Sequence, residues 1–151
     1  MKKMLLVAAG LAGLATALPA AAQFQKPGDA IEYRQSAFTL IATHFGRVAA
    51  MAQGKAPFDA KVAAENIALV STLSKLPLTA FGPGTDKGHK TEAKPAVWSD
   101  AAGFKAAADK YVAAVEKLDA AGKTGDFAQI KAAVGETGGS CKGCHDKFRE
   151  K

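Results

Sequence analysis

Four stretches of the chain place apolar residues at alternating steps of three and four, the spacing that gives a helix one apolar stripe. We expect these helices over Pro27 to Gln53, Asp59 to Leu76, Ser99 to just before Gly122, and Phe127 to Phe148. Short connections join them, except for residues 77–98, where repeated glycine and proline forbid a continuous helix. The pattern therefore predicts an all-α fold, an antiparallel four-helix bundle with a long loop between the second and third helices.

Two polar residues interrupt the stripes, Arg34 in the first helix and Asn66 in the second. The residues of the second helix that we expect to face the core are Val62, Asn66, Leu69, Leu73 and Leu76. Phe81 and Trp98 stand near the two ends of the long loop and are expected to pin it to the bundle.

The first 22 residues have the features of a secretory signal peptide. Lys2 and Lys3 give a basic start, residues 5–18 form an uncharged apolar run, and small residues follow at 20–22. The run of about 14 residues is shorter than the roughly 20 that a spanning helix needs. We expect cleavage after Ala22, which leaves residues 23–151 as one domain without stable membrane insertion. The alternative is a membrane anchor kept by the mature chain.

The net charge of +6 comes from lysines and arginines that are scattered along the chain. No block of five or six like charges marks a basic patch, so nucleic acid is not an expected partner. A solvated surface explains the same residues.

The two cysteines of the chain stand close together near its C-terminus, in Cys141-Lys142-Gly143-Cys144-His145. This spacing is the attachment motif of a c-type haem. Residues three apart lie on one helix face, so both thiols can add to the two haem vinyl groups. His145 follows at once and is expected to bind the haem iron as its axial ligand.

A disulfide, a thioredoxin-like redox site and a zinc site are the three alternatives to haem attachment for the cysteine pair. An exported chain could form a disulfide, and a Cys-x-x-Cys pair could be a thioredoxin-like redox site, but no βαβ pattern surrounds it. A zinc site would need about four ligands, and only His44, His89 and scattered acids remain. Export, the adjacent histidine and the helical stripe together favour haem.

The whole mature chain resembles cytochrome c′, a class II c-type cytochrome. The resemblance rests on residues 23–38 (QFQKPGDAIEYRQSAF), on Ala42 to Arg47, on LPLTAFGPGT, on WSDAAGFK and on the closing SCKGCHDKFR. It implies one covalently bound haem c per chain, enclosed by the first and last helices of a bundle. It also implies a homodimer formed through the first two helices.

The resemblance assigns roles to four further residues. Arg34, with Gln35 beside it, would contact a haem propionate; an arginine that snorkels outward is the alternative. Phe38 would cover the distal face of the haem, where low-spin relatives carry a methionine ligand. Arg149 would tune the axial histidine, and a solvent-facing arginine is the alternative.

The resemblance implies a periplasmic haem protein with five-coordinate, high-spin iron. It would bind nitric oxide and carbon monoxide, with a role in protection against nitric oxide, and would exchange electrons with a partner that the sequence does not identify. The alternative is a low-spin class II one-electron carrier, which needs a sixth ligand. Met51 lies about 20 Å along the helix from Phe38 and is too far away. We do not expect an enzyme, since Phe38 offers no acid or base.

Overall fold

The computed structural model describes residues 23–150; the expected signal peptide at residues 1–22 lies outside them. The regular secondary structure of the described chain is helical apart from one isolated bridge between Ala93 and Arg149. Its elements are α1 (Pro27–Ala52), α2 (Ala60–Leu73), the 3-10 helix η2 (Pro77–Ala80), α3 (Ala96–Ser99), α4 (Ala101–Thr124) and α5 (Phe127–Phe148). None of the described helices is long and apolar enough to cross a membrane.

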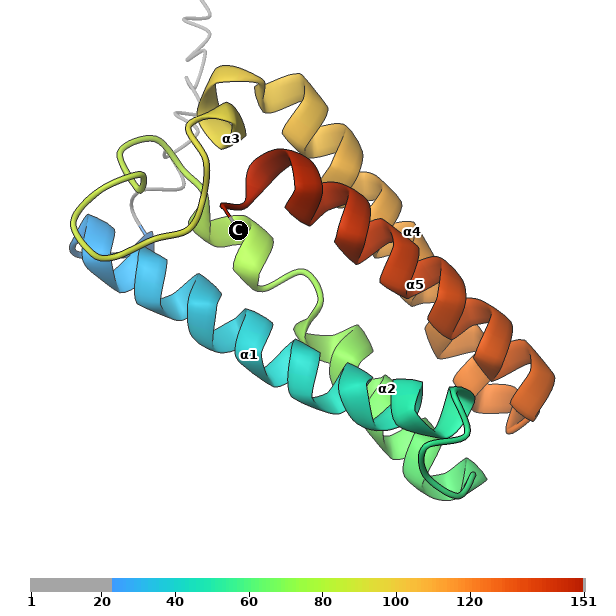
Figure 1. Cartoon of the computed structure of the whole chain (residues 1–151). Coiled ribbons are helices and arrows are strands. Elements are labelled where there is room, and N and C mark those ends of the chain that lie inside the picture. Colours follow the sequence, from blue (N-terminus) through green and yellow to red (C-terminus); the bar gives the residue numbers. More distant parts are fainter. Residues whose placement is uncertain (1–22, 151) are drawn as a thin grey trace, which may run out of the picture.

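The four long helices form a bundle, as predicted (Figure 1). Helix α1 packs against α2 and α5, and α4 completes the ring by packing against the same two helices. The core between them is built from aliphatic side chains of all four helices, among them Ile41, Val48, Ile67, Val70, Val115, Leu118, Ile130 and Val134.

The helix boundaries follow local capping chemistry. The side chains of Asp59 and Asp126 accept hydrogen bonds from backbone N–H groups in the first turns of α2 and α5. At α4 the expected start at Ser99 was wrong: Ser99 ends the short α3, and Asp100 caps α4 through the N–H of Gly103. Helix α4 ends at Thr124, and Gly125 caps it with a φ of 69°, a conformation that favours glycine.

The buried face of α2 differs from the expected one. Ala63, Asn66, Ile67 and Val70 are buried, whereas Val62, Leu69 and Leu76 are more than a third exposed. Two adjacent apolar stripes run along this helix, so periodicity alone could not decide which of them faces α1 and α4. The other stripe remains on the surface of the described chain.

The long loop lies against the bundle at two places that position the site. At its start, the Trp98 indole Nε1 donates to the carbonyl oxygens of Phe81 and Gly82, both at 3.1 Å, which confirms the expected pinning. At its end, the N–H of Lys94 donates to the Phe148 carbonyl at 2.9 Å, and that of Glu150 donates to the Glu92 carbonyl at 2.7 Å. The loop is therefore fastened to the end of α5.

Candidate functional site

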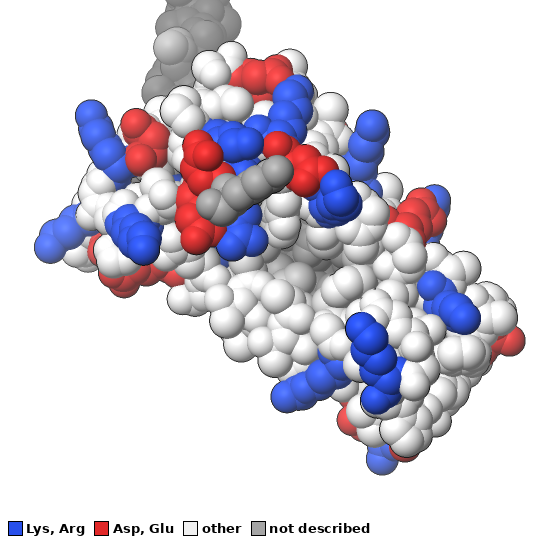
Figure 2. Space-filling model, in the orientation of Figure 1, with Lys and Arg blue, Asp and Glu red and all other residues white. Residues whose placement is uncertain are grey.

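A cavity of about 630 Å³ opens between α1, the long loop, α4 and the C-terminal half of α5. All the site residues expected from the sequence line it: Arg34, Gln35, Phe38, Cys141, Cys144, His145 and Arg149. Most of the other lining side chains are apolar, including Ile41, Phe45, Val70, Leu78, Phe104 and Phe148. Figure 2 shows the hollow bordered by uncharged residues, with charged side chains gathered above it in that view. The site is thus a largely apolar chamber with polar groups at one end.

Cys141 and Cys144 stand one helical turn apart on α5, and both thiols are half-buried and free. Burial raises the pKa of both, and for Cys144 the neighbouring Cys141 adds to the effect. The thiols are therefore neutral near pH 7, unlike the thiolate of a reactive redox pair. Residues 23–150 contain no cluster of three or more His, Cys, Asp or Glu side chains placed to hold a metal ion.

His145 lies beside the cysteines in the last turns of α5 and lines the same cavity. Its pKa is lowered by partial burial, and the positive charge of Arg149 lowers it further. The imidazole is consequently neutral near pH 7, which is the form that binds a metal.

Arg34 is 2% exposed, so it does not snorkel to solvent. Its guanidinium donates to the Ala80 carbonyl at 2.9 Å and to the hydroxyls of Thr85 and Thr91, both at 3.1 Å. It also lies over the Phe81 ring, with Cζ 4.5 Å from the centroid. Burial lowers the pKa of Arg34, and Asp86 opposes that shift. Arg34 thus anchors the long loop to α1 from inside.

Gln35, which follows Arg34 on α1, is exposed, and its Nε2 donates to the Lys90 carbonyl at 2.9 Å. A guanidinium carries five N–H donors, and the loop takes three of those of Arg34. Both expected propionate contacts therefore also bind the loop that borders the cavity.

Replacing Arg34 by methionine is expected to loosen this loop. Each lost hydrogen bond contributes on the order of 1 kcal/mol, offset in part because a buried charge is removed. We expect amide hydrogen exchange in residues 82–91 to quicken by roughly tenfold or more. Arg34→Lys keeps the charge but lacks the planar guanidinium group. Its amide exchange rate in residues 82–91 is expected to lie between those of the parent protein and Arg34→Met. Unchanged exchange in Arg34→Met would show that other contacts hold the loop.

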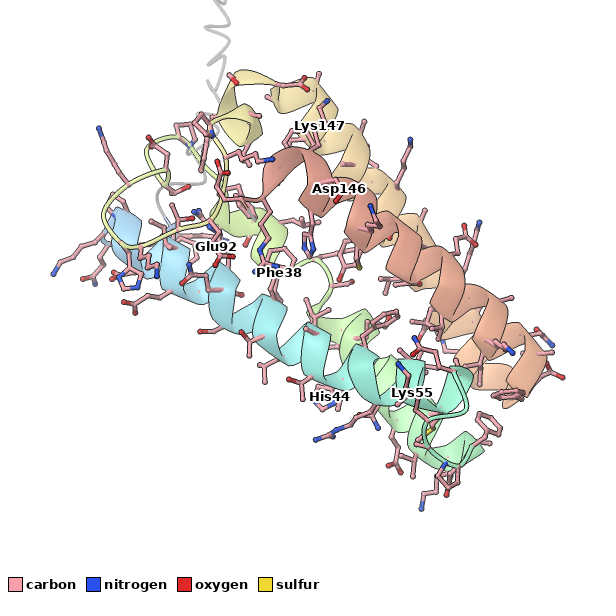
Figure 3. The ribbon with its side chains drawn as sticks, viewed as in Figure 1. Phe38, His44, Lys55, Glu92, Asp146 and Lys147 are labelled. Atoms are coloured by element: carbon pink, nitrogen blue, oxygen red, sulfur yellow. The ribbon has the colours of Figure 1, made fainter. Side chains whose placement is uncertain are left out.

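Phe38 projects from α1 towards the space between α1 and α5 (Figure 3). Its ring centroid lies 6.4 Å from that of Phe81, which in turn lies 5.0 Å from Phe104. Phe104 meets Phe148 edge to face at 5.4 Å. The cavity is therefore bordered by a chain of aromatic contacts from α1 through the loop to α4 and α5.

Arg149 lies just beyond α5, where the backbone has become extended. Its Nε and Nη2 donate to one carboxylate oxygen, Oε2 of Glu92, at 2.8 and 2.6 Å. Glu92 was not predicted from the sequence, because it is separated from Arg149 by 57 positions and lies in a loop without periodicity. A second, smaller cavity of about 300 Å³ is lined by Glu92, His145, Asp146, Arg149 and Glu150.

Tyr111 on α4 also lines the large cavity. Its Oη is the one buried side-chain nitrogen or oxygen in the described chain without a hydrogen-bond partner. Burial raises the pKa of Tyr111, so the hydroxyl remains an O–H donor. An unsatisfied buried hydroxyl costs about 1–3 kcal/mol and calls for a reason, such as a group that belongs in the cavity.

The remaining histidines and Met51 lie away from the cavity. Nδ1 of His44 is 2.9 Å from Oδ1 of Asn66 on α2, and Figure 3 shows His44 on the side of α1 remote from α5. His89 lies in the loop, 3.5 Å from the carboxylate of Glu32. Met51 belongs to the hydrophobic core.

The comparisons with known proteins agree on one family. The sequence profile of the family Cytochrome C′ matches residues 29–149. A relative from Rubrivivax gelatinosus, named cytochrome c′, is 95% identical over 129 residues, which cover 85% of this chain and 100% of the relative. The chain belongs to the cytochrome c′ family.

Solved structures of cytochrome c′ have the same fold. The crystal structure of the Rubrivivax gelatinosus protein has a TM-score of 0.84 and 94% identity, covering 85% of this chain and 100% of that one. Structures of cytochrome c prime from Alcaligenes xylosoxidans, one a nitric oxide complex of a mutant and one a variant with bound carbon monoxide, have TM-scores of 0.79 and 48% identity. They cover 85% of this chain and 98% and 99% of their own.

The cytochrome c′ family implies a haem c, and the cavity suits such a group. Its walls are mainly apolar, as a macrocycle requires, and guanidinium and amide groups lie at one end. The two free thiols and the neutral imidazole share one wall on α5. The unpartnered hydroxyl of Tyr111 is a further sign that the cavity is built around a group other than protein.

Proposed function

We propose that this protein is a periplasmic haem protein with five-coordinate, high-spin iron that binds nitric oxide and carbon monoxide and protects against nitric oxide. The observation that carries the proposal is the composition of the large cavity. Its lining contains one imidazole, that of His145, and no methionine. Apart from Arg34, Gln35 and Thr39, the α1 and α2 residues that line it are apolar: Phe38, Ile41, Ala42, Phe45 and Val70. Within the described residues, the cavity thus offers the imidazole of His145 to the iron, and its α1 and α2 walls offer no histidine or methionine as a second ligand.

Three residues of α5 hold the group. Cys141 and Cys144 would form the thioether bonds, each thiol adding across a vinyl group, and neutral His145 would be the axial ligand. The haem iron supplies, when bound, the position at which a diatomic gas coordinates. Two thioethers fix the macrocycle to the same helix that carries the iron ligand, so the imidazole and the ring keep one geometry.

Phe38 controls what reaches that position. Its ring can neither coordinate iron nor donate a strong hydrogen bond, so it excludes water and gives no help to a ligand that needs a polar partner. Nitric oxide and carbon monoxide depend less on such a partner than oxygen does. The Alcaligenes protein, whose solved structures carry nitric oxide and carbon monoxide, supports this ligand class. The same apolar wall lacks an acid or base, which favours gas binding over substrate turnover.

Arg34 and Gln35 would hold the propionate end of the haem while they keep the loop closed. A guanidinium has N–H groups to spare beyond the three bonds that it makes to the loop. A propionate would also supply the anion that this buried cation lacks among its direct hydrogen-bond partners.

Export is part of the proposal. Covalent haem attachment is expected of an exported chain, and residues 1–22 have the sequence features of a signal peptide. The Rubrivivax relative aligns over its whole length across 129 residues, which is the length expected after cleavage behind Ala22.

A homodimer through α1 and α2 is also proposed. The large aliphatic side chains that remain exposed on or next to these helices are Leu40, Val62, Leu69 and Leu76, each between 38% and 49% exposed. Exposed aliphatic side chains on neighbouring helices favour a protein contact.

The coordination of the iron decides between this function and a low-spin electron carrier. Optical and electron paramagnetic resonance spectra of the ferric and ferrous protein are expected to show high-spin haem that shifts on addition of carbon monoxide. A low-spin haem whose spectra do not change on addition of carbon monoxide would refute the proposal.

The variant Phe38→Met tests whether position 38 faces the iron. A thioether introduced at this position is expected to coordinate the iron and to convert most of the haem to the low-spin form, as the same spectra would record. Phe38→Leu is the control, since it changes the size of the side chain without adding a ligand. Spectra of Phe38→Met that match those of the control would mean that position 38 does not face the iron.

A further inference from the structure

Glu92 holds Arg149 against the end of α5 by two kinds of contact. Its carboxylate oxygen Oε2 accepts from both Nε and Nη2 of Arg149, at 2.8 and 2.6 Å. Its backbone carbonyl accepts from the N–H of Glu150 at 2.7 Å, beside the bridge between Ala93 and Arg149. The guanidinium is thus fixed from the loop, although it is only half-buried.

This ion pair is next to His145. Glu92, His145 and Arg149 line both the large cavity and the smaller one, so the pair lies between the two cavities on the imidazole side. Figure 3 shows Glu92 on the loop at the opening between α1 and the end of α5. The N–H of Arg149 also donates to the His145 carbonyl at 3.0 Å. The backbone of Arg149 is thereby tied to the helical turn that carries His145.

We propose that Glu92 is a positioning residue for the axial histidine: it fixes the Arg149 guanidinium beside His145 and so sets the environment of the iron–histidine bond. The inference rests on the proposed haem function. A metal-bound imidazole is tuned by the groups around it, and a cation held by two hydrogen bonds has one position, whereas a released one samples many. An exposed ion pair adds little to stability, so its effect here is on geometry and charge at the site.

The test compares Glu92→Gln with Glu150→Gln in the haem-loaded, full-length mature protein. Glu150 lines the same small cavity, so its substitution removes the same charge there without breaking the pair. We expect the iron–histidine stretching band in the resonance Raman spectrum of the ferrous protein to broaden and shift in Glu92→Gln. Glu150→Gln is expected to leave that band unchanged. Equal spectra of the two variants would overturn the proposal.

A second variant shows whether Glu92 acts through Arg149. In an Arg149→Met background, adding Glu92→Gln is expected to change the Raman band no further. An undiminished additional shift would mean that Glu92 acts directly on the site and would refute the positioning role. The Nε–H resonance of Arg149 in nitrogen-15 NMR gives a readout independent of the iron: it is expected to be distinct in the parent protein and averaged in Glu92→Gln.

Folding and the proposed function are checked separately. Protection of the Lys94 and Glu150 amides from hydrogen exchange in Glu92→Gln would show that the backbone clip survives the loss of the carboxylate. Failure of the haem proposal itself would appear in the parent protein, as a missing covalent haem or a low-spin spectrum. If the parent protein is high-spin and its iron–histidine stretching band does not change in Glu92→Gln, the positioning role alone is refuted.

Discussion

Replacing both Cys141 and Cys144 by alanine is expected to abolish covalent haem retention. The sequence contains two cysteines in all, so no other thiol can form a thioether in their place. The double variant keeps His145 and the apolar cavity and can still bind haem reversibly through them. After denaturation and gel electrophoresis, haem staining should be lost from the polypeptide completely, and acidified solvent should extract all the haem.

The single variants serve as controls for the double one. Cys141→Ala and Cys144→Ala each keep one thiol on the cavity wall and are expected to retain haem through one bond. Haem that stays with the double variant under denaturing conditions would refute thioether attachment at this pair. Helical circular dichroism of the unloaded chain separates loss of attachment from loss of the fold, because alanine suits the middle of α5.

The attachment motif could be read from the sequence because its geometry is local. Residues three and four apart on one helix meet on one face wherever that helix packs. The bundle could be predicted for a similar reason, since each apolar stripe depends on the residues of one helix only. Phe38, Arg34 and Gln35 were placed by resemblance to a family, and the structure brings them to the same cavity as the cysteines.

Contacts between distant segments escaped the sequence. The oxygens that accept from Arg34 belong to Ala80, Thr85 and Thr91, which are 46 to 57 positions away in an irregular loop. Glu92 was missed for the same reason. On α2 the error had another cause, because two apolar stripes share the helix and burial depends on which neighbours it meets. Asn66 and Leu73 of the expected stripe do pack inward, whereas its exposed members, Val62, Leu69 and Leu76, are the ones that support the proposed dimer.

Phe38→Ala is expected to speed carbon monoxide association with the ferrous haem by about tenfold or more. A tenfold change corresponds to removing about 1.4 kcal/mol from the barrier. The physical reason is steric, since the aromatic ring lines the cavity and, under the proposed function, would have to move before a ligand reaches the iron. Flash photolysis or stopped-flow mixing measures the rate, and Phe38→Leu, with an intermediate volume, should give an intermediate rate.

Phe45→Ala is the matched control for this variant. Phe45 lines the same cavity from α1, about 10 Å further along the helix, and loses the same ring on substitution. Both variants leave a void and should lose stability to a similar extent, so urea denaturation checks that they are comparable. A faster rate in Phe38→Ala alone would locate the barrier at position 38. Equal acceleration in both would instead assign the effect to general loosening of the cavity, and an unchanged rate in both would move the barrier to another part of the entry path.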